Sequence, residues 1–516
     1  MSKFGEKVKS MLRNWLQIQP AAQNSIVLQE PLSHQASVIR NQIWYRGEAA
    51  ELEQLYKQLG AQDGTNAARF WAAVPSNNLK LRKIHSGLPA ILVDTLAYLV
   101  KSDMDDVEFN RDAGKQAWED ITQELDFQDA VGKGIAGALK SGDGAWKIMI
   151  DDPKDPEASP YPHVEFYEAD RVEYIHKNGR ITGIRFWTTY REKHREYRLC
   201  ETYRKGSVSY ALFEGEHEVS LDCVPELAGL KPVEFDGGFI MAVPLKFYDS
   251  PKFSGRGKAI YESKLDDFDA LDEVISQWWD AIRAGRVKKY IPRDLVPTDP
   301  KTGKIMRMND FGSEYIVTES ASGENDTSKI EMVQPEIRYE AFLSSYLAAL
   351  DMCLQGIVSP ATLGIDVGKR SSAEAQREKK DVTGYTRNTI TGVLEKVLPQ
   401  LIRVILTTYD LMRGEAPGVY NPSVGFGEYG APSFDARVET VNQAAAAATM
   451  SIETQVDQMW GNSKDAEWKA AEVARIKALR GIEERLLKPS IGEGCGRSLP
   501  TRGVWWYDVA ADAPVV

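Results

Sequence analysis

The sequence contains few of the residues that most often bind metal ions. Its 516 residues include only four cysteines and six histidines. The cysteines lie far apart, form no Cys-x-x-Cys pair and have no histidine at metal-ligand spacing: Cys200, Cys223, Cys353 and Cys495. Cys353 falls on the apolar face of a predicted helix, where a small core residue is expected. The composition favours a reducing cytoplasm, and we expect neither a metal ion nor a cofactor.

Long hydrophobic runs and an excess of positive charge are also lacking. The most apolar stretches, residues 87–100 and 398–412, are short and are interrupted by Asp94 and Arg403, so no membrane span or signal peptide is predicted. Lys and Arg number 63 against 75 Asp and Glu, a net charge of −12. Proteins that bind nucleic acid tightly without sequence preference cluster Lys and Arg against phosphates. We therefore expect DNA to pass this protein rather than stay bound to it.

Motifs for catalysis are missing as well. Residues 364–370 resemble a phosphate-binding loop only superficially, because the spacing is short and Arg370 occupies the place of a metal-binding hydroxyl. No Gly-x-Ser-x-Gly motif occurs, and no two histidines lie at helical ligand spacing. His163 and His176 could meet across strands, which leaves one alternative open: a hydrolase with a site in the β-rich region 145–243. The sequence otherwise predicts a protein without enzymatic activity.

The middle of the chain, residues 257–413, carries the clearest pattern. A helix is predicted over 258–286 and a second over 338–357, each with apolar residues at a three-to-four spacing. In the first helix the acidic residues, including Asp269 and Asp272, are expected to face away from the apolar stripe. Between the helices, residues 287–337 form an insertion with two strand-like runs, 314–318 and 329–333.

A third and much longer helix is predicted to start at a capping box. Ser371 and Glu374 have the Ser-x-x-Glu spacing in which each side chain satisfies a backbone amide. The apolar pattern continues to about residue 412, which corresponds to a length of about 60 Å. Pro399 lies inside this pattern and should kink the helix near Glu395. A helix longer than one domain core indicates a strut within a large assembly.

The flanking regions complete a predominantly helical α+β chain. Helices are predicted over residues 33–59, with a break near Gly47, and over 77–100 and 114–141. Glycines late in the last of these would permit close packing. Short strands follow up to residue 243, with Asn178-Gly179 as a hairpin turn. After a linker and a short strand at 424–429, three helices are predicted over 434–449, 451–460 and 463–479.

With this order of elements, the chain resembles the portal proteins of tailed bacteriophages, specifically the portal family of siphophages. Five stretches carry the resemblance: IRNQIWYRGEAAELEQLY, KLRKIHSGLPAILVDTLA, GIDVGKRSSAEAQREKKDVT, FGEYGAPSFDARVETVNQA and SIETQVDQMWG. The resemblance implies a ring-forming portal-type fold with these parts: a wing (1–256), two stem helices (257–286 and 338–358), a clip (287–337), a tunnel loop (359–371), a long kinked spine helix with a returning wing strand (372–430), and crown helices with a tail (431–516).

The same resemblance implies a function and partners. It implies a ring of usually twelve copies at one capsid vertex of the virion, assembled in the host bacterial cytoplasm, through which double-stranded DNA is packaged and ejected. The implied partners are the terminase large subunit, a head-completion adaptor, and the major capsid and scaffolding proteins; no membrane partner is expected. Lys369 and Arg370 would lie near the DNA, and Lys288, Lys289 and Arg293 would contact DNA or an acidic partner. A capsid-associated adaptor without a channel, and solvated charges at these positions, remain open alternatives.

Overall fold

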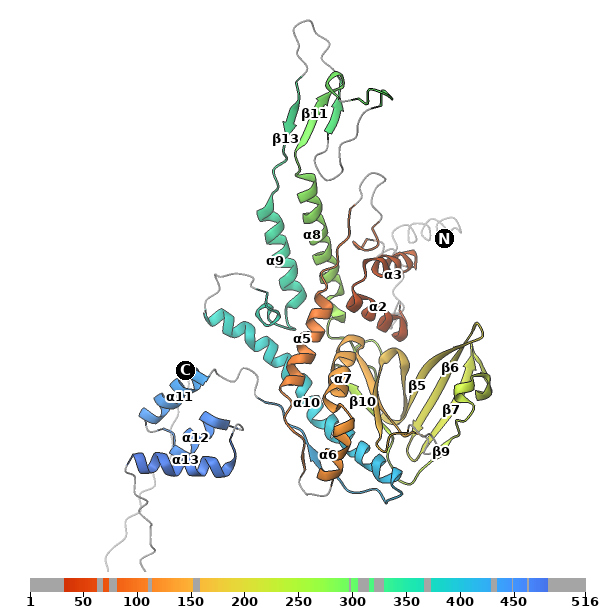
Figure 1. The fold of residues 1–516 in the computed structure, drawn as a ribbon, viewed down its shortest axis with the longest axis vertical. Helices are drawn as coiled ribbons and strands as arrows, with labels where there is room; N and C mark the ends of the chain where they lie inside the picture. The colour runs from red at the N-terminus through yellow and green to blue at the C-terminus, as the bar shows by residue number, and fades with distance from the viewer. Residues whose placement is uncertain are drawn as a thin grey trace, which may run out of the picture. The chain divides into compact units, whose positions relative to one another are not determined.

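A computed structural model describes residues 32–62, 68–73, 81–109, 114–151, 158–296, 298–304, 315–319, 329–365, 373–427, 434–447, 449–461 and 464–480. The chain divides into two compact units, Met1–Tyr429 and Gly430–Val516. Helices and β-sheets both occur, with more residues in helices, so the predicted α+β class is confirmed (Figure 1).

The first unit begins with a group of helices. They are α2 (His34–Arg46), α3 (Ala49–Gln62), α5 (Leu88–Ser102), α6 (Lys115–Glu124) and α7 (Phe127–Ser141). The predicted break near Gly47 is confirmed: Gly47 adopts a left-handed conformation (φ 72°) and donates to the Ile43 carbonyl at the end of α2.

Two of the helix predictions here were wrong in their extent. The helix expected from residue 77 begins only at Leu88, because residues 81–87 are not helical and Gly87 is left-handed (φ 71°). The helix expected over 114–141 is divided between α6 and α7, since Leu125 is extended and the Asp126 side chain accepts from the Asp129 amide as the N-cap of α7. Local capping overrides the continuous apolar period.

Two sheets follow the helices. The first has the order β10-β2-β3, and the second has the order β4-β5-β6-β7-β8 with β9 added at β7. Their strands are β2 (Asp143–Met149), β3 (His163–Glu168), β4 (Val172–Lys177), β5 (Arg180–Glu192), β6 (Arg195–Arg204), β7 (Ser207–Glu214), β8 (His217–Val219), β9 (Val233–Glu234) and β10 (Ala242–Lys246). The predicted Asn178-Gly179 hairpin is confirmed, because both residues have positive φ (52° and 74°) between β4 and β5.

Close packing of α7 on the first sheet depends on glycines. A Cβ on Gly137 would lie 2.6 Å from Cε1 of Phe166, and one on Gly134 would overlap the Trp146 indole. The indole is fully buried and donates its Nε1 hydrogen to the Ala130 carbonyl at 3.1 Å. Glycines at these positions therefore let the helix approach the sheet, as the sequence indicated.

A pair of helices and a small sheet form the next part of the first unit (Figure 1). Helix α8 (Leu265–Ala284) lies beside α9 (Tyr339–Leu354), and between them in sequence come β11 (Lys288–Pro292), β12 (Tyr315–Thr318) and β13 (Glu331–Val333). Strand β11 pairs parallel with β12 and antiparallel with β13. The two strands predicted in the insertion are confirmed; β11 was missed. Helix α8 begins seven residues later than residue 258, after a short 3-10 turn.

The long predicted helix is α10 (Ala373–Met412), and Pro399 lies inside it. Five residues of the predicted apolar stripe are buried: Ile390, Leu394, Leu398, Ile402 and Ile405. Leu401, Val404 and Leu406 are buried as well, whereas Tyr385, with which the stripe was predicted to begin, is 73% exposed. After α10 the chain returns as β14 (Pro422–Ser423), which pairs with β1 (Glu108–Phe109). The strand predicted at 424–429 is thus displaced to Pro422–Ser423, with a single further bridge from Phe426 to Met104. Arg387 donates to the Gly427 carbonyl of this returning segment and to the Asp103 carboxylate, 2.9 Å away.

Short 3-10 helices connect several of these elements. They are η1 (Ala169–Arg171), η2 (Leu221–Cys223), η3 (Pro225–Leu227), η4 (Glu262–Lys264), η5 (Arg293–Leu295) and η6 (Pro360–Leu363).

The second unit consists, in its described part, of α11 (Phe434–Ala446), α12 (Ile452–Trp460) and α13 (Ala466–Leu479). These agree with the three predicted helices within a few residues. Ser451 caps α12 and Asp465 caps α13, each accepting from a backbone amide three residues later. Few described side chains of this unit are buried, and α13 has none.

Candidate assembly surface on the α8–α9 pair

The base of α8 is anchored by two buried carboxylates. Asp272 is fully buried; its oxygens accept from the Ser86 amide (2.8 Å) and the Trp71 indole (3.2 Å), and one lies 2.6 Å from Nδ1 of His85. Asp269 accepts from the amides of Phe70 (2.9 Å) and Trp71 (3.3 Å). The prediction that both acids face away from the buried side was wrong. They form polar contacts that tie α8 to residues 70–71 and 85–86.

Above this base, α8 and α9 hold each other through aromatic rings. The Trp278 and Phe342 rings lie nearly parallel, 5° apart in plane and 6.3 Å between centroids, and Tyr346 also contacts Trp278. Near the end of α8, a Cβ on Gly285 would lie 2.6 Å from the Ile337 side chain. These contacts fix how the two helices are aligned along their length. Trp278 lies at the same height as Phe342, and Gly285 at the same height as Ile337.

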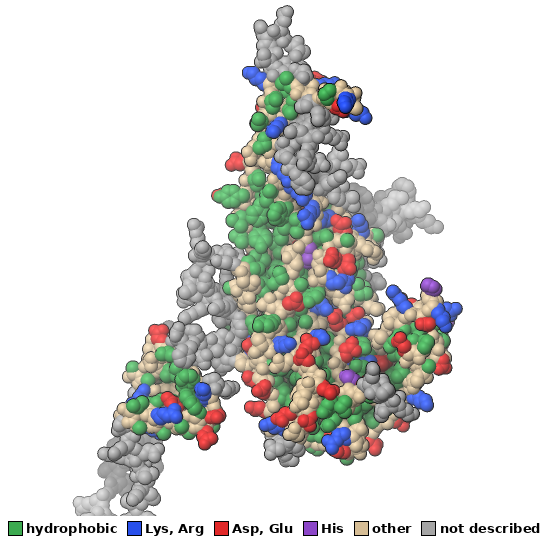
Figure 2. All heavy atoms as spheres, in the orientation of Figure 1, with side chains coloured by type: hydrophobic (Ala, Val, Ile, Leu, Met, Phe, Trp, Pro, Cys, Tyr) green, Lys and Arg blue, Asp and Glu red, His purple; other side chains and the backbone are tan. Residues whose placement is uncertain are grey.

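The outer surface of the pair is unusually apolar for a solvent-exposed surface. Figure 2 shows hydrophobic side chains gathered over α8 and α9. The large apolar side chains exposed there are Trp279, Ile282, Tyr339, Leu343 and Met352, of which Trp279 is 56% and Tyr339 is 59% exposed. Contiguous apolar surface of this kind marks an interaction site in soluble proteins. We refer to these five residues as the hairpin apolar surface.

The small sheet beyond the helices has exposed apolar side chains on both faces among its described residues. Successive residues of a strand point to opposite faces, and exposed apolar residues occur at successive positions in two strands: Ile316, Val317, Met332 and Val333. Lys288 and Lys289 lie on β11, and Arg293 lies at the start of η5 and is exposed. These three basic residues are thus close in the chain at the end of the α8–α9 pair. Their contact with DNA or an acidic partner stays a prediction.

The predicted DNA-proximal and capping residues of the tunnel loop lie outside the described part of the chain, although residues 359–365 of the loop are described. Lys369, Arg370 and Ser371 are not described, and of Glu374 only the backbone within α10 is. The start of this segment is held against α10, because the Ser359 amide donates to Oγ1 of Thr383 at 2.9 Å and Thr386 donates to the Ile357 carbonyl at 2.6 Å. The capping box and the DNA contact of Lys369 and Arg370 therefore remain predictions, as does a kink at Pro399.

The β-rich region does not bring the two candidate histidines together. His163 lies on β3 with Nε2 2.7 Å from Asp151, while His176 lies on β4, in the other sheet, against Gly255. The buried ionic group of this region is Lys147 with Glu201. Burial acts to lower the pKa of Lys147, but Glu201 and Tyr167 outweigh burial and raise it. This lysine is a charged partner in a closed ion pair, not a base open to a substrate.

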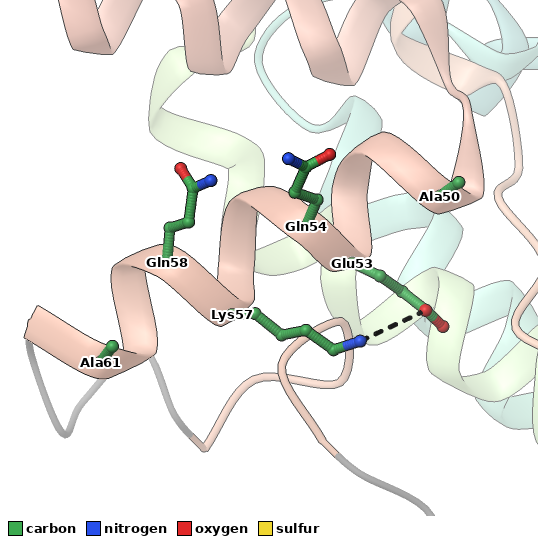
Figure 3. Close-up of a pocket in the computed structure, with 6 residues that line it drawn as sticks. All are labelled: Ala50, Glu53, Gln54, Lys57, Gln58 and Ala61. Atoms are coloured by element: carbon green, nitrogen blue, oxygen red, sulfur yellow. Dashed lines mark ion pairs between the residues drawn. The ribbon is translucent and has the colours of Figure 1, made fainter.

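A shallow hollow also lies along α3. Its volume is about 560 Å³, and it is lined by the side chains labelled in Figure 3, among them Glu53 and Lys57, which form a surface ion pair. Within the described residues no group of His, Cys, Asp or Glu is arranged to hold a metal ion. No helix in the described ranges is both long and apolar enough for a membrane span. Cys353 is buried on α9, as the apolar pattern predicted.

Comparisons with known proteins identify distant structural likenesses. No family model matches the chain, and no curated protein matches it. Among solved structures, a chain from the neck of a native gene transfer agent (GTA) particle computed with C12 symmetry is 11% identical, with a TM-score of 0.34 over 75% of this chain and 89% of that chain.

Two further structures of gene transfer agent particles give similar values. A chain from the neck of an empty particle computed with C6 symmetry has a TM-score of 0.38 and 12% identity over 71% of this chain and 87% of that chain. A chain from the virion of a native particle has a TM-score of 0.34 and 12% identity over 72% and 89%. Likenesses of this size do not by themselves establish a common fold.

Proposed function

We propose that this protein is a portal subunit, one copy of a ring at a capsid vertex through which double-stranded DNA enters and leaves a phage-type particle. The observation that carries the proposal is the α8–α9 pair. Among the described residues, one chain leaves the hairpin apolar surface exposed, together with apolar side chains on both faces of the small terminal sheet. Burial of apolar area is the main driving force for association, so copies side by side would cover what a single copy exposes.

The proposal assigns a role to each part of the chain. In it, α8 and α9 are the stem, residues 287–337 are the clip, residues 359–371 are the tunnel loop, α10 is the spine and α11–α13 belong to the crown. The clip would meet the terminase large subunit and later the head-completion adaptor. The major capsid and scaffolding proteins would surround the ring in the virion. The sequence resemblance supports these assignments.

The charge of the chain fits a conduit better than a DNA-binding protein. With a net charge of −12, the protein repels a duplex on the whole, so DNA would not have to be released from a strong binding surface at each step. Lys369, Arg370, Lys288, Lys289 and Arg293 are the basic residues proposed to make transient contacts. No catalytic residue, cofactor or metal is part of the proposal, because the energy for translocation would come from the terminase.

Imaging of the full-length protein tests the proposal. The protein is purified at several concentrations, its mass distribution is measured by mass photometry, and the particles are imaged by electron microscopy. The expected result is a closed ring, with about twelve copies and a lumen wide enough for a duplex. A compact monomer at the highest concentration contradicts the proposal. A closed assembly without a lumen would instead support an adaptor without a channel.

A further inference from the structure

A pocket with two arginines lies on the side of α8, just above its anchored base. Its volume is about 260 Å³, and it is lined by Arg82, Ile84, Ser276, Trp279, Asp280 and Arg283. The pocket combines an apolar wall with two guanidinium groups. Within the described part of the chain, neither arginine has an ion-pair partner, and Asp280 pairs with neither. The pocket is thus prepared for an apolar side chain accompanied by a negative charge.

The first turns of α9 carry side chains that complement the pocket: exposed apolar side chains and a carboxylate. Tyr339, Glu340 and Leu343 are exposed, and the chain entering α9 is net negative through Glu336 and Glu340 against Arg338. Glu340 receives one hydrogen bond from the Tyr339 hydroxyl (3.3 Å) and has no ion pair among the described residues. We call Tyr339, Glu340 and Leu343 the α9 stripe.

Arg283 of the pocket and Glu340 of the stripe point to opposite edges of the helix pair. At about 100° per residue, Trp279 and Arg283 are about 100° and 140° round α8 from Trp278, which faces α9. Counted in the same way, Leu343 and Glu340 are about 100° and 160° round α9 from Phe342, which faces α8. A single pair therefore cannot bring Arg283 and Glu340 together. Two copies side by side can.

The two surfaces also lie at the same level along the pair. Trp278 stacks on Phe342, and Gly285 contacts Ile337, so the segment from Trp279 to Arg283 lies beside the segment from Glu340 to Phe342. Rotation about an axis parallel to the helices leaves the height of every residue unchanged. Such a rotation would bring the stripe of one copy to the pocket of the next, in a head-to-tail contact that closes into a ring.

We propose that the α9 stripe of one copy occupies the Arg82–Arg283 pocket of its neighbour, with Glu340 paired to Arg283 and Leu343 against Trp279. This proposal rests on the proposed ring and names the contact that joins its subunits. It also gives the pocket an occupant of defined chemistry: a glutamate and a leucine at adjacent positions of a second copy of this chain.

Charge reversal in the full-length protein tests the pairing. Arg283→Glu and Glu340→Arg place like charges together, so each single variant is expected to raise the concentration needed for assembly by more than about tenfold. The double variant restores opposite charges at every contact. An equimolar mixture of the two single variants also restores them, because alternating copies pair Glu with Arg at one contact and the reversed residues at the next.

Both restorations are expected to return the assembly concentration to within about threefold of wild type. Arg286→Glu, the same change near the end of α8 but outside the pocket, serves as the control, and melting temperatures confirm that each variant is folded. Rings that form equally well from the single variants, or a double variant and mixture that stay monomeric, overturn the pairing. If wild-type rings form in that case, the proposed function stands; if the wild type forms none, both proposals fail.

Discussion

At the scale of single residues, the strongest structural dependence falls on Asp272. Its carboxylate is fully buried. It accepts hydrogen bonds from Trp71 and Ser86 and contacts the His85 ring, and these three residues lie about two hundred residues earlier in the chain. Asp272→Ala leaves these groups buried without a partner, so we expect a loss of about 3 kcal/mol in the free energy of unfolding. Urea denaturation of wild type and variant measures it.

Glu273→Ala is the matched control for Asp272→Ala, because Glu273 is the next carboxylate on α8 and its described contact is a hydrogen bond from Gln277 on the same helix. The control is expected to change the free energy of unfolding by less than about 0.5 kcal/mol. Equal urea midpoints for Asp272→Ala and Glu273→Ala would show that Asp272 does not anchor α8.

His34 predicts a pH dependence of stability. Its ring packs edge-on against Phe253, and its buried Nε2 has no hydrogen-bond partner in the described structure. Burial first, and then Arg256, lower the pKa of His34 to about 4, while Asp143 acts in the opposite direction. Near pH 5 the unfolded chain therefore binds a proton at His34 that the folded chain does not bind.

The sign of the His34 effect follows from this difference in proton binding. The stability contributed by neutral His34 is complete above pH 6.5 and is lost as the pH falls towards 4. We expect His34→Leu to lose less stability than wild type between pH 6.5 and 5, measured by urea denaturation at each pH. His217→Leu, at an exposed strand end, is the control. Parallel curves for wild type and His34→Leu would contradict the prediction.

At the scale of elements, helices and turns that depend on contacts between nearby residues could be predicted from the sequence pattern. The apolar period of α10 runs unbroken from Ile390 to Ile405, and each of its stripe residues is buried. The break at Gly47 and the turn at Asn178-Gly179 were also predictable, because left-handed backbone requires these residue types. The order of α8, the insertion, α9 and α10 therefore follows from periodicity and turn chemistry.

The features that could not be predicted from the sequence depend on contacts between residues far apart in the chain. Asp269 and Asp272 look like a solvated helix face, and only the amides and rings of residues 70–71 and 85–86 make their burial favourable. Strand β11 contains two lysines and a proline and has little strand character alone; it exists because β12 and β13 flank it. In the candidate assembly surface, the neighbouring Trp278 and Trp279 could be recognised from the sequence. The pocket could not, because it combines Arg82 and Ile84 with residues of α8 that lie far away in the chain.

The packing of α7 predicts opposite effects for two neighbouring glycines. A methyl group at Gly134 would overlap the buried Trp146 indole, whereas one at Gly132 would meet only the flexible side chain of Lys101, at 3.1 Å. We expect Gly134→Ala to destabilise the protein by about 1–3 kcal/mol through overpacking. Gly132→Ala should be neutral or stabilising by up to about 1 kcal/mol, because alanine favours the helix.

Thermal unfolding of the two α7 variants measures this difference. The melting temperature is expected to fall for Gly134→Ala and to hold or rise for Gly132→Ala, relative to wild type. If both variants melt together, the close approach of α7 to the sheet is not limited by the Trp146 ring, and the helix has room to shift.

At the scale of the whole molecule, the chain divides into two units, and the main apolar core belongs to the first of them. The main apolar core draws its residues from Trp44 to Val424, with Phe426 packed against it, and no described residue of the second unit belongs to it. Helices α8 and α9, the candidate pocket and the hairpin apolar surface also belong to the first unit. Both the stability of this unit and the proposed contact between copies should therefore be independent of residues beyond Tyr429.

A chain truncated after Tyr429 tests this independence, because it keeps every residue of that core. We expect its main thermal transition to lie within a few degrees of that of the full-length protein, since all the described residues of the core are kept. We also expect it to form closed assemblies at concentrations where the full-length protein does, measured by mass photometry. A truncated chain that melts normally but stays monomeric would place an essential contact between copies in the second unit. A truncated chain that no longer unfolds cooperatively would show that the core is incomplete without that unit.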